Sequence, residues 1–316
     1  MITAELLSKD YGAKRAVDAV SFTVAPGKVT GFLGPNGAGK STTMRMIVGL
    51  DRPSGGSVSV NGRRYAEHAA PLREVGALLE AKSMHKSRSA RTHLRAIAAT
   101  HSIPTRRVDE VIELTGLAGV ATKKVGGFSL GMGQRLGIAV ALLGDPQTLI
   151  LDEPVNGLDP EGVLWVRNLA RQQAAAGKTV FLSSHLMSEM AVTADHLIVI
   201  GRGRIVADAP IEQVIGGHNV PTCTVKTDSA VELMNALAAA NVHLTRLDAE
   251  TIEVAGLDGR AIATRALETG ILIHELTPVR QSLEQAYMAL TQGEVEYQSG
   301  GSDGPSPMTN TRQEQP

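Results

Sequence analysis

The segment Gly34-Pro-Asn-Gly-Ala-Gly39-Lys40-Ser41 decides the fold of this chain. It matches the pattern G-x-x-x-x-G-K-[ST] at every fixed position, between an apolar run that ends at Leu33 and a predicted helix that begins near Lys40. Glycines in such a loop let backbone N–H groups turn toward an anion, and the helix N-terminus adds partial positive charge. The segment therefore predicts a binding site for a nucleoside triphosphate.

The loop, which we call the phosphate loop, has an expected role at each position. Lys40 is expected to reach the terminal phosphates, the Ser41 hydroxyl to bind Mg²⁺, and Thr42 to contact the α-phosphate from the first helical turn. A chance match is expected on the order of once in a hundred chains of this length. The other loop residues expected to line the nucleotide site are Gly34, Pro35, Asn36, Gly37, Ala38 and Gly39.

Short apolar runs alternate with helical patterns from residue 1 to about residue 216, which predicts a parallel sheet with crossover helices. Such unbroken runs suit strands that are buried on both faces, and open α/β sheets place their sites where these strands end. The predicted strands include Val29–Leu33, Thr148–Leu151, Thr179–Leu182 and Leu197–Ile200.

Two of these strands end in side chains that suit phosphate chemistry. Asp152 and Glu153 follow Thr148–Leu151: Asp152 is predicted to hold Mg²⁺, and Glu153 to polarise a water that attacks the γ-phosphate. His185 follows the next strand and is predicted to sense the γ-phosphate. The alternatives are solvated acids at a strand end and a structural histidine.

Between these elements lies Phe128-Ser129-Leu130-Gly131-Met132-Gly133-Gln134-Arg135, ahead of a helical run. It resembles the signature segment of ATP-binding-cassette (ABC) proteins, usually written L-S-G-G-Q. The phosphate loop, this segment, the Asp152-Glu153 pair, the Asn156-Gly-Leu-Asp159-Pro turn and Ser-Ser-His185 follow the order of that family. The resemblance covers about residues 1–216 and implies an α/β P-loop NTPase cassette, with a parallel core sheet, an N-terminal antiparallel β part and a helical insert at about 81–145.

The resemblance also implies partners and further site residues. Family members form head-to-tail dimers, so Ser129 and Gly131 are expected to contact nucleotide on a second subunit, as a homodimer or a heterodimer with a related ATPase. Asp159 matches the loop that links the two sites. Tyr11 matches the aromatic residue that stacks on adenine, although a core or surface tyrosine remains the alternative.

Three positions depart from the family pattern. Leu130 replaces a signature glycine and Met132 replaces its glutamine, while Ser129 and Gly131 remain. Glu80 stands where the family has a glutamine near Mg²⁺ and the attacking water; an ordinary exposed acid is the alternative. The departures resemble a bacterial subgroup that exports antibiotics and peptides and commonly carries an extra C-terminal domain.

Residues 217–292 follow the order βαββαβ, which predicts a ferredoxin-like α+β domain after a linker at Gly216–Gly217. A helix near Ser282–Leu290 is expected to close this domain, and residues 293–316 are expected to be disordered. A dimerisation role and a regulatory role both remain open. The predicted strands are Thr222–Lys226, His243–Leu247, Thr251–Ala255 and Ile271–Leu276, and the predicted helices are Ser229–Ala240 and Gly259–Thr269.

Composition limits the partners of the chain. Its net charge of -1 gives no support for binding nucleic acid, and the single Cys223 excludes an internal disulfide. No window reaches about 18 uninterrupted apolar residues and no export signal is visible, so we expect a cytoplasmic protein at the inner face of the cell membrane, with a separate permease. The first part of the insert is basic and is expected to face acidic permease loops or anionic headgroups; its basic residues are Lys82, His85, Lys86, Arg88, Arg91, His93 and Arg95.

The leading hypothesis is therefore an ATP-hydrolysing subunit of an ABC transporter that powers export of drugs or other small molecules. An importer ATPase is the first alternative. A soluble cassette ATPase that acts on ribosomes or DNA is the second, but the interval between Lys40 and Asp152 has no room for a long coiled coil. A kinase would leave the signature segment unexplained.

Overall fold

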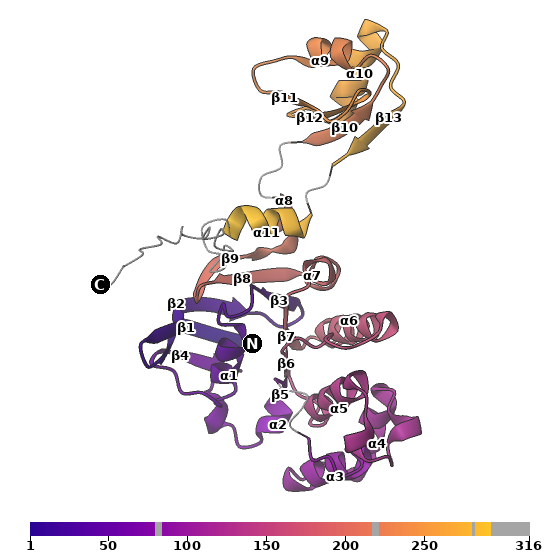
Figure 1. Ribbon diagram of the computed structural model, residues 1–316. Helices are drawn as coiled ribbons and strands as arrows, with labels where there is room; N and C mark the ends of the chain where they lie inside the picture. Colours follow the sequence, from indigo (N-terminus) through magenta and orange to yellow (C-terminus); the bar gives the residue numbers. More distant parts are fainter. Residues whose placement is uncertain (80–83, 217–220, 280–281, 292–316) are drawn as a thin grey trace, which may run out of the picture.

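The computed structural model describes residues 1–79, 84–216, 221–279 and 282–291, and its centre is a six-stranded sheet (Figure 1). The strand order is β5-β6-β7-β3-β8-β9, in which the first five strands are parallel and β9 is antiparallel to β8. These strands comprise β5 (Val75–Leu78), β6 (Thr148–Leu151), β7 (Thr179–Ser184), β3 (Val29–Leu33), β8 (His196–Gly201) and β9 (Arg204–Pro210). All residues of β3, β6 and β7 are buried, which confirms the apolar runs as central strands.

An antiparallel sheet of order β2-β1-β4 packs beside the core sheet, as the resemblance implied. Its strands are β1 (Ile2–Tyr11), β2 (Lys14–Val24) and β4 (Gly55–Val60). The ring centroid of Phe22 of β2 lies 6.0 Å from that of Phe32 and 5.9 Å from that of Phe181 in the core sheet, and the last two rings are 5.2 Å apart. Offset aromatic packing of this kind joins the two sheets into one apolar cluster.

Helices cover the core sheet and form the insert. α3, α4 and α5 pack on one another, and α5 also contacts β5, so the helical insert lies at one end of the core sheet (Figure 1). The helices of this part are α1 (Lys40–Ile47), α2 (Pro71–Glu74), α3 (Ala90–Thr100), α4 (Thr105–Leu114), α5 (Leu130–Leu142), α6 (Pro160–Ala175), α7 (Met187–Thr193) and α8 (Ile211–Gly216). One-turn 3-10 helices span Tyr65–Glu67, Ala118–Val120 and Val125–Gly127.

The C-terminal sheet has the order β11-β12-β10-β13, with every neighbouring pair antiparallel. This order and direction are those of the ferredoxin-like fold, which confirms the predicted pattern. The last strand begins at Glu275 and not at Ile271, because Gly270 ends the preceding helix in a left-handed conformation and a short loop follows. The elements are β10 (Thr222–Lys226), α9 (Ala230–Leu237), β11 (His243–Arg246), β12 (Thr251–Ala255), α10 (Gly259–Thr269) and β13 (Glu275–Pro278).

The final helix corrects one expectation. α11 (Leu283–Thr291) lies where a helix was predicted, but it contacts α7, α8 and β9 and does not close the small domain. Leu283 and Tyr287 are 1% and 5% exposed and belong to the main apolar core. We therefore group α11 with the cassette. The predicted linker residue Gly217 and the predicted disordered tail 293–316 lie outside the described residues.

No helix in the described ranges is long and apolar enough to cross a membrane.

Candidate nucleotide-binding and hydrolysis site

The phosphate loop joins β3 to α1 and depends on its glycines. A Cβ atom at Gly34 would lie 2.3 Å from the carbonyl oxygen of Ile200, so any side chain there would clash with β8. Gly39 has φ +110, and a Cβ atom there would lie 2.7 Å from the carbonyl oxygen of Ala16. Both positions therefore require glycine, and the loop is held against neighbouring backbone as the sequence pattern predicts.

The N-terminus of α1 is suited to an anion. Gly39 is its N-cap and supplies no side-chain cap, so the first-turn N–H groups have no side-chain acceptor at this end. Lys40 folds back over the loop, and its Nζ donates hydrogen bonds to the carbonyl oxygens of Gly34 at 2.6 Å and Pro35 at 3.3 Å. The loop is thus already closed around its lysine.

Lys40 is only 6% exposed. Burial lowers the pKa of its amine, while Glu153 and Asp152 act in the opposite direction and raise it. Lys40 Nζ lies 3.9 Å from Glu153 Oε1. The structure therefore brings Lys40, which follows β3, close to the two acids that follow β6. A bound phosphate would give the Lys40 amine a new negative partner in place of these carboxylates.

The two acids are fixed by a residue that the sequence reasoning did not single out. Ser183, at the end of β7, is fully buried; its Oγ donates to Asp152 Oδ1 at 2.5 Å and accepts from the Glu153 backbone N–H at 2.9 Å. Gln134 of α5 donates from Nε2 to the Glu153 carbonyl oxygen at 3.0 Å. Glu153 itself has φ +49, a left-handed conformation that costs a non-glycine residue about 1 kcal/mol or more. These contacts hold a strained backbone in place.

His185 lies beside Glu153. Its Nδ1 is 2.8 Å from Glu153 Oε2, so the Glu153 carboxylate lies between the imidazole and the Lys40 amine. A carboxylate at this point, next to the phosphate loop, is placed to accept a proton from a water or to orient it. Ser183 was visible in the sequence only as part of the Ser-Ser-His185 segment.

The signature segment is not joined to the phosphate loop. Ser129 is the exposed N-cap of α5, and its Oγ accepts from the Met132 N–H at 3.2 Å. A Cβ atom at Gly131 would lie 3.2 Å from the carbonyl oxygen of Gly157, which places the segment against the turn before α6. Asp159 caps α6, with Oδ1 accepting from the Gly162 N–H at 2.9 Å. Across the described ranges, no hydrogen bond or ion pair links these residues to the phosphate loop.

Leu130, the residue that replaces a family glycine, has a structural role. Leu130 is 53% exposed. A Cβ atom added at Gly157, which has φ +75, would nevertheless lie 2.2 Å from Leu130 Cδ2. Leu130 therefore packs directly over the Gly157 backbone. This contact ties the signature segment to the Asp159 turn within one chain.

Tyr11 lies at the end of β1 next to α1. Its hydroxyl donates to Asp51 Oδ2 at 2.8 Å, and Lys9 Nζ lies 5.0 Å from the ring centroid. The hydrogen bond to Asp51 raises the pKa of Tyr11, and Arg45 lowers the pKa of Asp51. The tyrosine is 49% exposed, so its ring is held at the surface beside the first turn of α1 and is open to a ligand.

Hard oxygen donors are available for Mg²⁺. Ser41, at the second position of α1, and Asp152, after β6, supply a hydroxyl and a carboxylate. Mg²⁺ typically takes one or two carboxylates and completes its shell with substrate phosphates and water, so this small donor set fits it. The described residues contain no cluster of three His, Cys, Asp or Glu that would form a protein cage. Glu80, the third predicted ligand, lies outside the described residues.

Comparison with known proteins agrees with this geometry. Residues 17–156 match the family model described as "ABC transporter", and residues 221–284 match a domain of unknown function. The uncharacterized ABC transporter ATP-binding protein YhcH of Bacillus subtilis is 34% identical over 90% of this chain and 94% of its own length.

Two further proteins match about two thirds of this chain. The bacitracin transport ATP-binding protein BcrA of Bacillus licheniformis is 41% identical over 66% of this chain and 69% of its own length. A solved ATP-binding subunit of an ABC transporter superposes with a TM-score of 0.63 at 28% identity, over 68% of this chain and 91% of that one. The chain therefore belongs to the ABC family and is an ATP-binding, ATP-hydrolysing subunit of an ABC transporter.

Proposed function

We propose that this ATPase works as a head-to-tail dimer that drives a membrane permease for the export of antibiotics or other small molecules. The main observation in favour of a dimer is that the N-terminus of α1 and the N-terminus of α5, the two helix ends suited to an anion, are not joined within the described residues of one chain. The phosphate loop is closed around buried Lys40, whereas Ser129 is exposed and has no link to that loop in the described part of the chain. In the proposed dimer, the signature segment of a second copy covers the nucleotide bound at the phosphate loop.

In the proposed mechanism, positioning and electrostatics supply most of the rate. The backbone amides of the loop and Lys40 bind the β- and γ-phosphates, and Glu153 orients a water in line with the γ-phosphate. His185, 2.8 Å from Glu153, holds the carboxylate and contacts the γ-phosphate. Ser41 and Asp152 would hold Mg²⁺, which when bound neutralises charge on the phosphate oxygens.

Glu153→Gln tests the proposed site. The amide keeps the size of the side chain but is no longer a base, so we expect ATP binding to be retained, turnover to fall at least about a hundredfold, and a dimer to accumulate with ATP. Size-exclusion chromatography with light scattering reads the dimer directly. A Glu153→Gln protein that stays monomeric at saturating ATP would contradict the shared site.

A groove beside the helical insert is the proposed permease site. It has a volume of about 510 Å³ and lies between the end of α1, β5, α3 and α5. Its walls combine apolar side chains with His93, whose Nδ1 is buried and has no hydrogen-bond partner among the described residues, and whose pKa is lowered by burial. The groove suits an amphipathic segment that adds apolar contacts and a polar group. Lining residues include Leu50, Tyr65, Leu79, Ile97 and Val140.

Basic residues before α3 and in its first turn favour an acidic partner segment; burial lowers the pKa of His93 of the groove, and Arg88 is close enough to lower it further. Arg88 and Lys86 precede α3, and Arg91 in its first turn forms an ion pair with Asp109 of α4. Lys82 lies outside the described residues. We expect Lys86→Glu/Arg88→Glu to reduce co-purification of the permease about tenfold or more, because like charges would then face each other. Arg260→Glu, on the C-terminal domain, is the matched control; equal recovery of permease with both proteins would contradict this site.

Export is favoured over import by the names of the relatives. One relative, 41% identical over 69% of its own length, is named as a bacitracin transport ATP-binding protein. The proposed location follows: the chain sits on the cytoplasmic face of the membrane, bound through its permease. Loss of the gene should lower resistance to the exported compound, and a requirement for an external binding protein in a transport assay would support import instead.

A further inference from the structure

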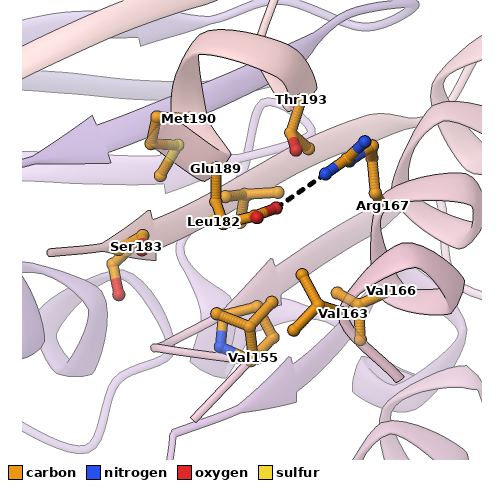
Figure 2. Close-up of a pocket in the computed structure, with 11 residues that line it drawn as sticks. Val155, Val163, Val166, Arg167, Leu182, Ser183, Glu189, Met190 and Thr193 are labelled. Carbon is orange, nitrogen blue, oxygen red and sulfur yellow. Dashed lines mark hydrogen bonds and ion pairs between the residues drawn. The ribbon is translucent and has the colours of Figure 1, made fainter. Parts of the chain in front are cut away.

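Two arginines of α6 hold α7 beside it. Arg167 Nη2 lies 2.9 Å from Glu189 Oε2, and one helical turn later Arg171 Nη2 donates to the Val192 carbonyl oxygen at 2.5 Å. Figure 2 shows the Arg167–Glu189 pair reaching across a pocket between the two helices. The pocket has a volume of about 20 Å³, room for about one water molecule, and apolar side chains such as Val155, Val166 and Leu182 line it.

The Arg167–Glu189 pair is partly buried. The two side chains are 25% and 28% exposed, and Arg167 Nε is buried without a hydrogen-bond partner in the described part of the chain. The ion pair gives this guanidinium a carboxylate partner, Glu189. Removal of either partner would leave a charge in a mostly apolar pocket, so the loss of one partner costs more here than at a solvent-exposed pair.

The two helices begin at functionally important positions. α6 starts after its N-cap Asp159, and α7 starts two residues after His185. α7 has seven residues, and its N-cap Leu186 makes no side-chain cap. A helix this short is positioned by tertiary contacts and not by its own stability. Its orientation, and with it that of His185, depends on its packing against α6, α11, β3 and β7, and the two arginines supply its polar contacts to α6.

The pocket also touches the catalytic strand ends. Its lining includes Pro154 and Val155, directly after Glu153, and Ser183 and Ser184, directly before His185. Met190 of α7 also lines this pocket (Figure 2) and packs over Gly31 of β3, where a Cβ atom would lie 2.7 Å from the Met190 Sδ. The α6–α7 contact therefore lies immediately behind the contact between His185 and Glu153.

We propose that Arg167 and Glu189 are positioning residues that fix α7 against α6 and so hold His185 on Glu153 during ATP turnover. The inference rests on the proposed role of His185. It predicts that a break in the ion pair acts on the chemical step and leaves ATP binding, which depends on the phosphate loop, almost unchanged.

The test uses the purified full chain and steady-state ATP hydrolysis. Arg167→Met and Glu189→Gln are each expected to lower kcat about fivefold with KM for ATP within about twofold. The charge-reversed double variant Arg167→Glu/Glu189→Arg is expected to recover kcat to within about twofold of the native value. Arg265→Ala removes a solvent-exposed ion pair within α10, Arg265–Glu268 at 3.1 Å, and is expected to leave kcat unchanged.

A double-mutant cycle separates positioning from packing. If Glu189 acts through His185, then Glu189→Gln should cause no further loss of kcat in a His185→Ala background. Additive losses, native kcat in both single variants, or no recovery in the reversed double variant would each overturn the inference. Glu189→Gln keeps the side-chain size and decides the test if Arg167→Met does not fold.

The His185→Ala protein distinguishes a wrong role for His185 from a wrong positioning role for Arg167 and Glu189. If His185→Ala itself keeps native kcat, the proposed role of His185 is wrong, and the inference falls with it. If His185→Ala lowers kcat while Arg167→Met and Glu189→Gln do not, then only the positioning inference is wrong.

Discussion

The phosphate loop and the signature segment are both helix N-termini, yet they differ in how much of a site each one completes. Lys40 is 6% exposed and already bonded to two loop carbonyls, and the carboxylates of Asp152 and Glu153 lie close by. The signature segment is capped by Ser129 and is exposed, with Leu130 at 53%. The phosphate loop, the preformed half of the site, thus already has its lysine and acids in place, whereas the signature segment has only a helix N-terminus. We therefore expect mutations to separate ATP binding from ATP hydrolysis.

Lys40→Ala should give the largest effect, because it removes the buried cation that lies inside the phosphate loop. We expect kcat/KM for ATP to fall about a thousandfold, with loss of ATP binding measured by calorimetry. Burial is the main influence on the pKa of Lys40 and lowers it, so the folded state holds this charge at a cost. We therefore expect a melting temperature within about 2 °C of the native value.

Lys28→Ala is the matched control for this change. Lys28 is an exposed lysine just before β3, and its removal should leave ATP binding unchanged. Normal ATP affinity in the Lys40→Ala protein would show that the loop backbone alone suffices, and the contrast between the two helix ends would lose its basis.

Gly131→Asp tests the other half. A Cβ atom there already approaches the Gly157 carbonyl oxygen to 3.2 Å, and the added carboxylate would face a phosphate supplied by the partner. We expect kcat to fall about a hundredfold while ATP affinity of the monomer stays within about twofold. Gly131→Ala, which adds only the Cβ, should lose much less activity.

Mixing the two inactive proteins sharpens the comparison further. A dimer of Lys40→Ala with Gly131→Asp contains one site made of a native phosphate loop and a native signature segment. We expect part of the activity to return on mixing, as measured by phosphate release. A mixture as inactive as its components would contradict a head-to-tail arrangement.

The sequence predicted what is local and missed what is distant in the chain. The phosphate loop could be predicted because the glycine spacing and the strand before it lie within one segment of the chain. Ser183 was missed as the partner of Asp152 because the two residues are 31 positions apart and meet only when β6 and β7 pair. α11 was assigned to the wrong part for the same reason: its amphipathic pattern shows a buried face but not which core, cassette or small domain, buries it.

Ser183→Ala should show how far the preformed half extends. The change removes the hydrogen bond to Asp152 and the acceptor for the Glu153 N–H, so a strained backbone loses its support. We expect kcat to fall about tenfold, and the free energy of unfolding to drop by about 1–3 kcal/mol from the unsatisfied groups. Steady-state kinetics and urea unfolding measure the two effects.

Thr179→Val is the matched control on the same strand. Thr179 is buried at the opposite end of β7 from Ser183, and its hydroxyl accepts from the N-terminal amine. Its removal should lower stability without changing kcat. Equal losses of kcat in both proteins would mean that β7 as a whole, and not the Ser183 hydroxyl, supports the acids.

Tyr11→Ala should give the smallest effect, because Tyr11 lies at the exposed margin of the preformed half. If its ring stacks on adenine, the lost contact is worth about 1 kcal/mol, and KM for ATP should rise about fivefold with kcat unchanged. Tyr11→Phe keeps the ring and removes only the hydroxyl that donates to Asp51, so KM should stay within about twofold. A native KM in the Tyr11→Ala protein would make Tyr11 an ordinary surface residue and leave base recognition to another part of the dimer.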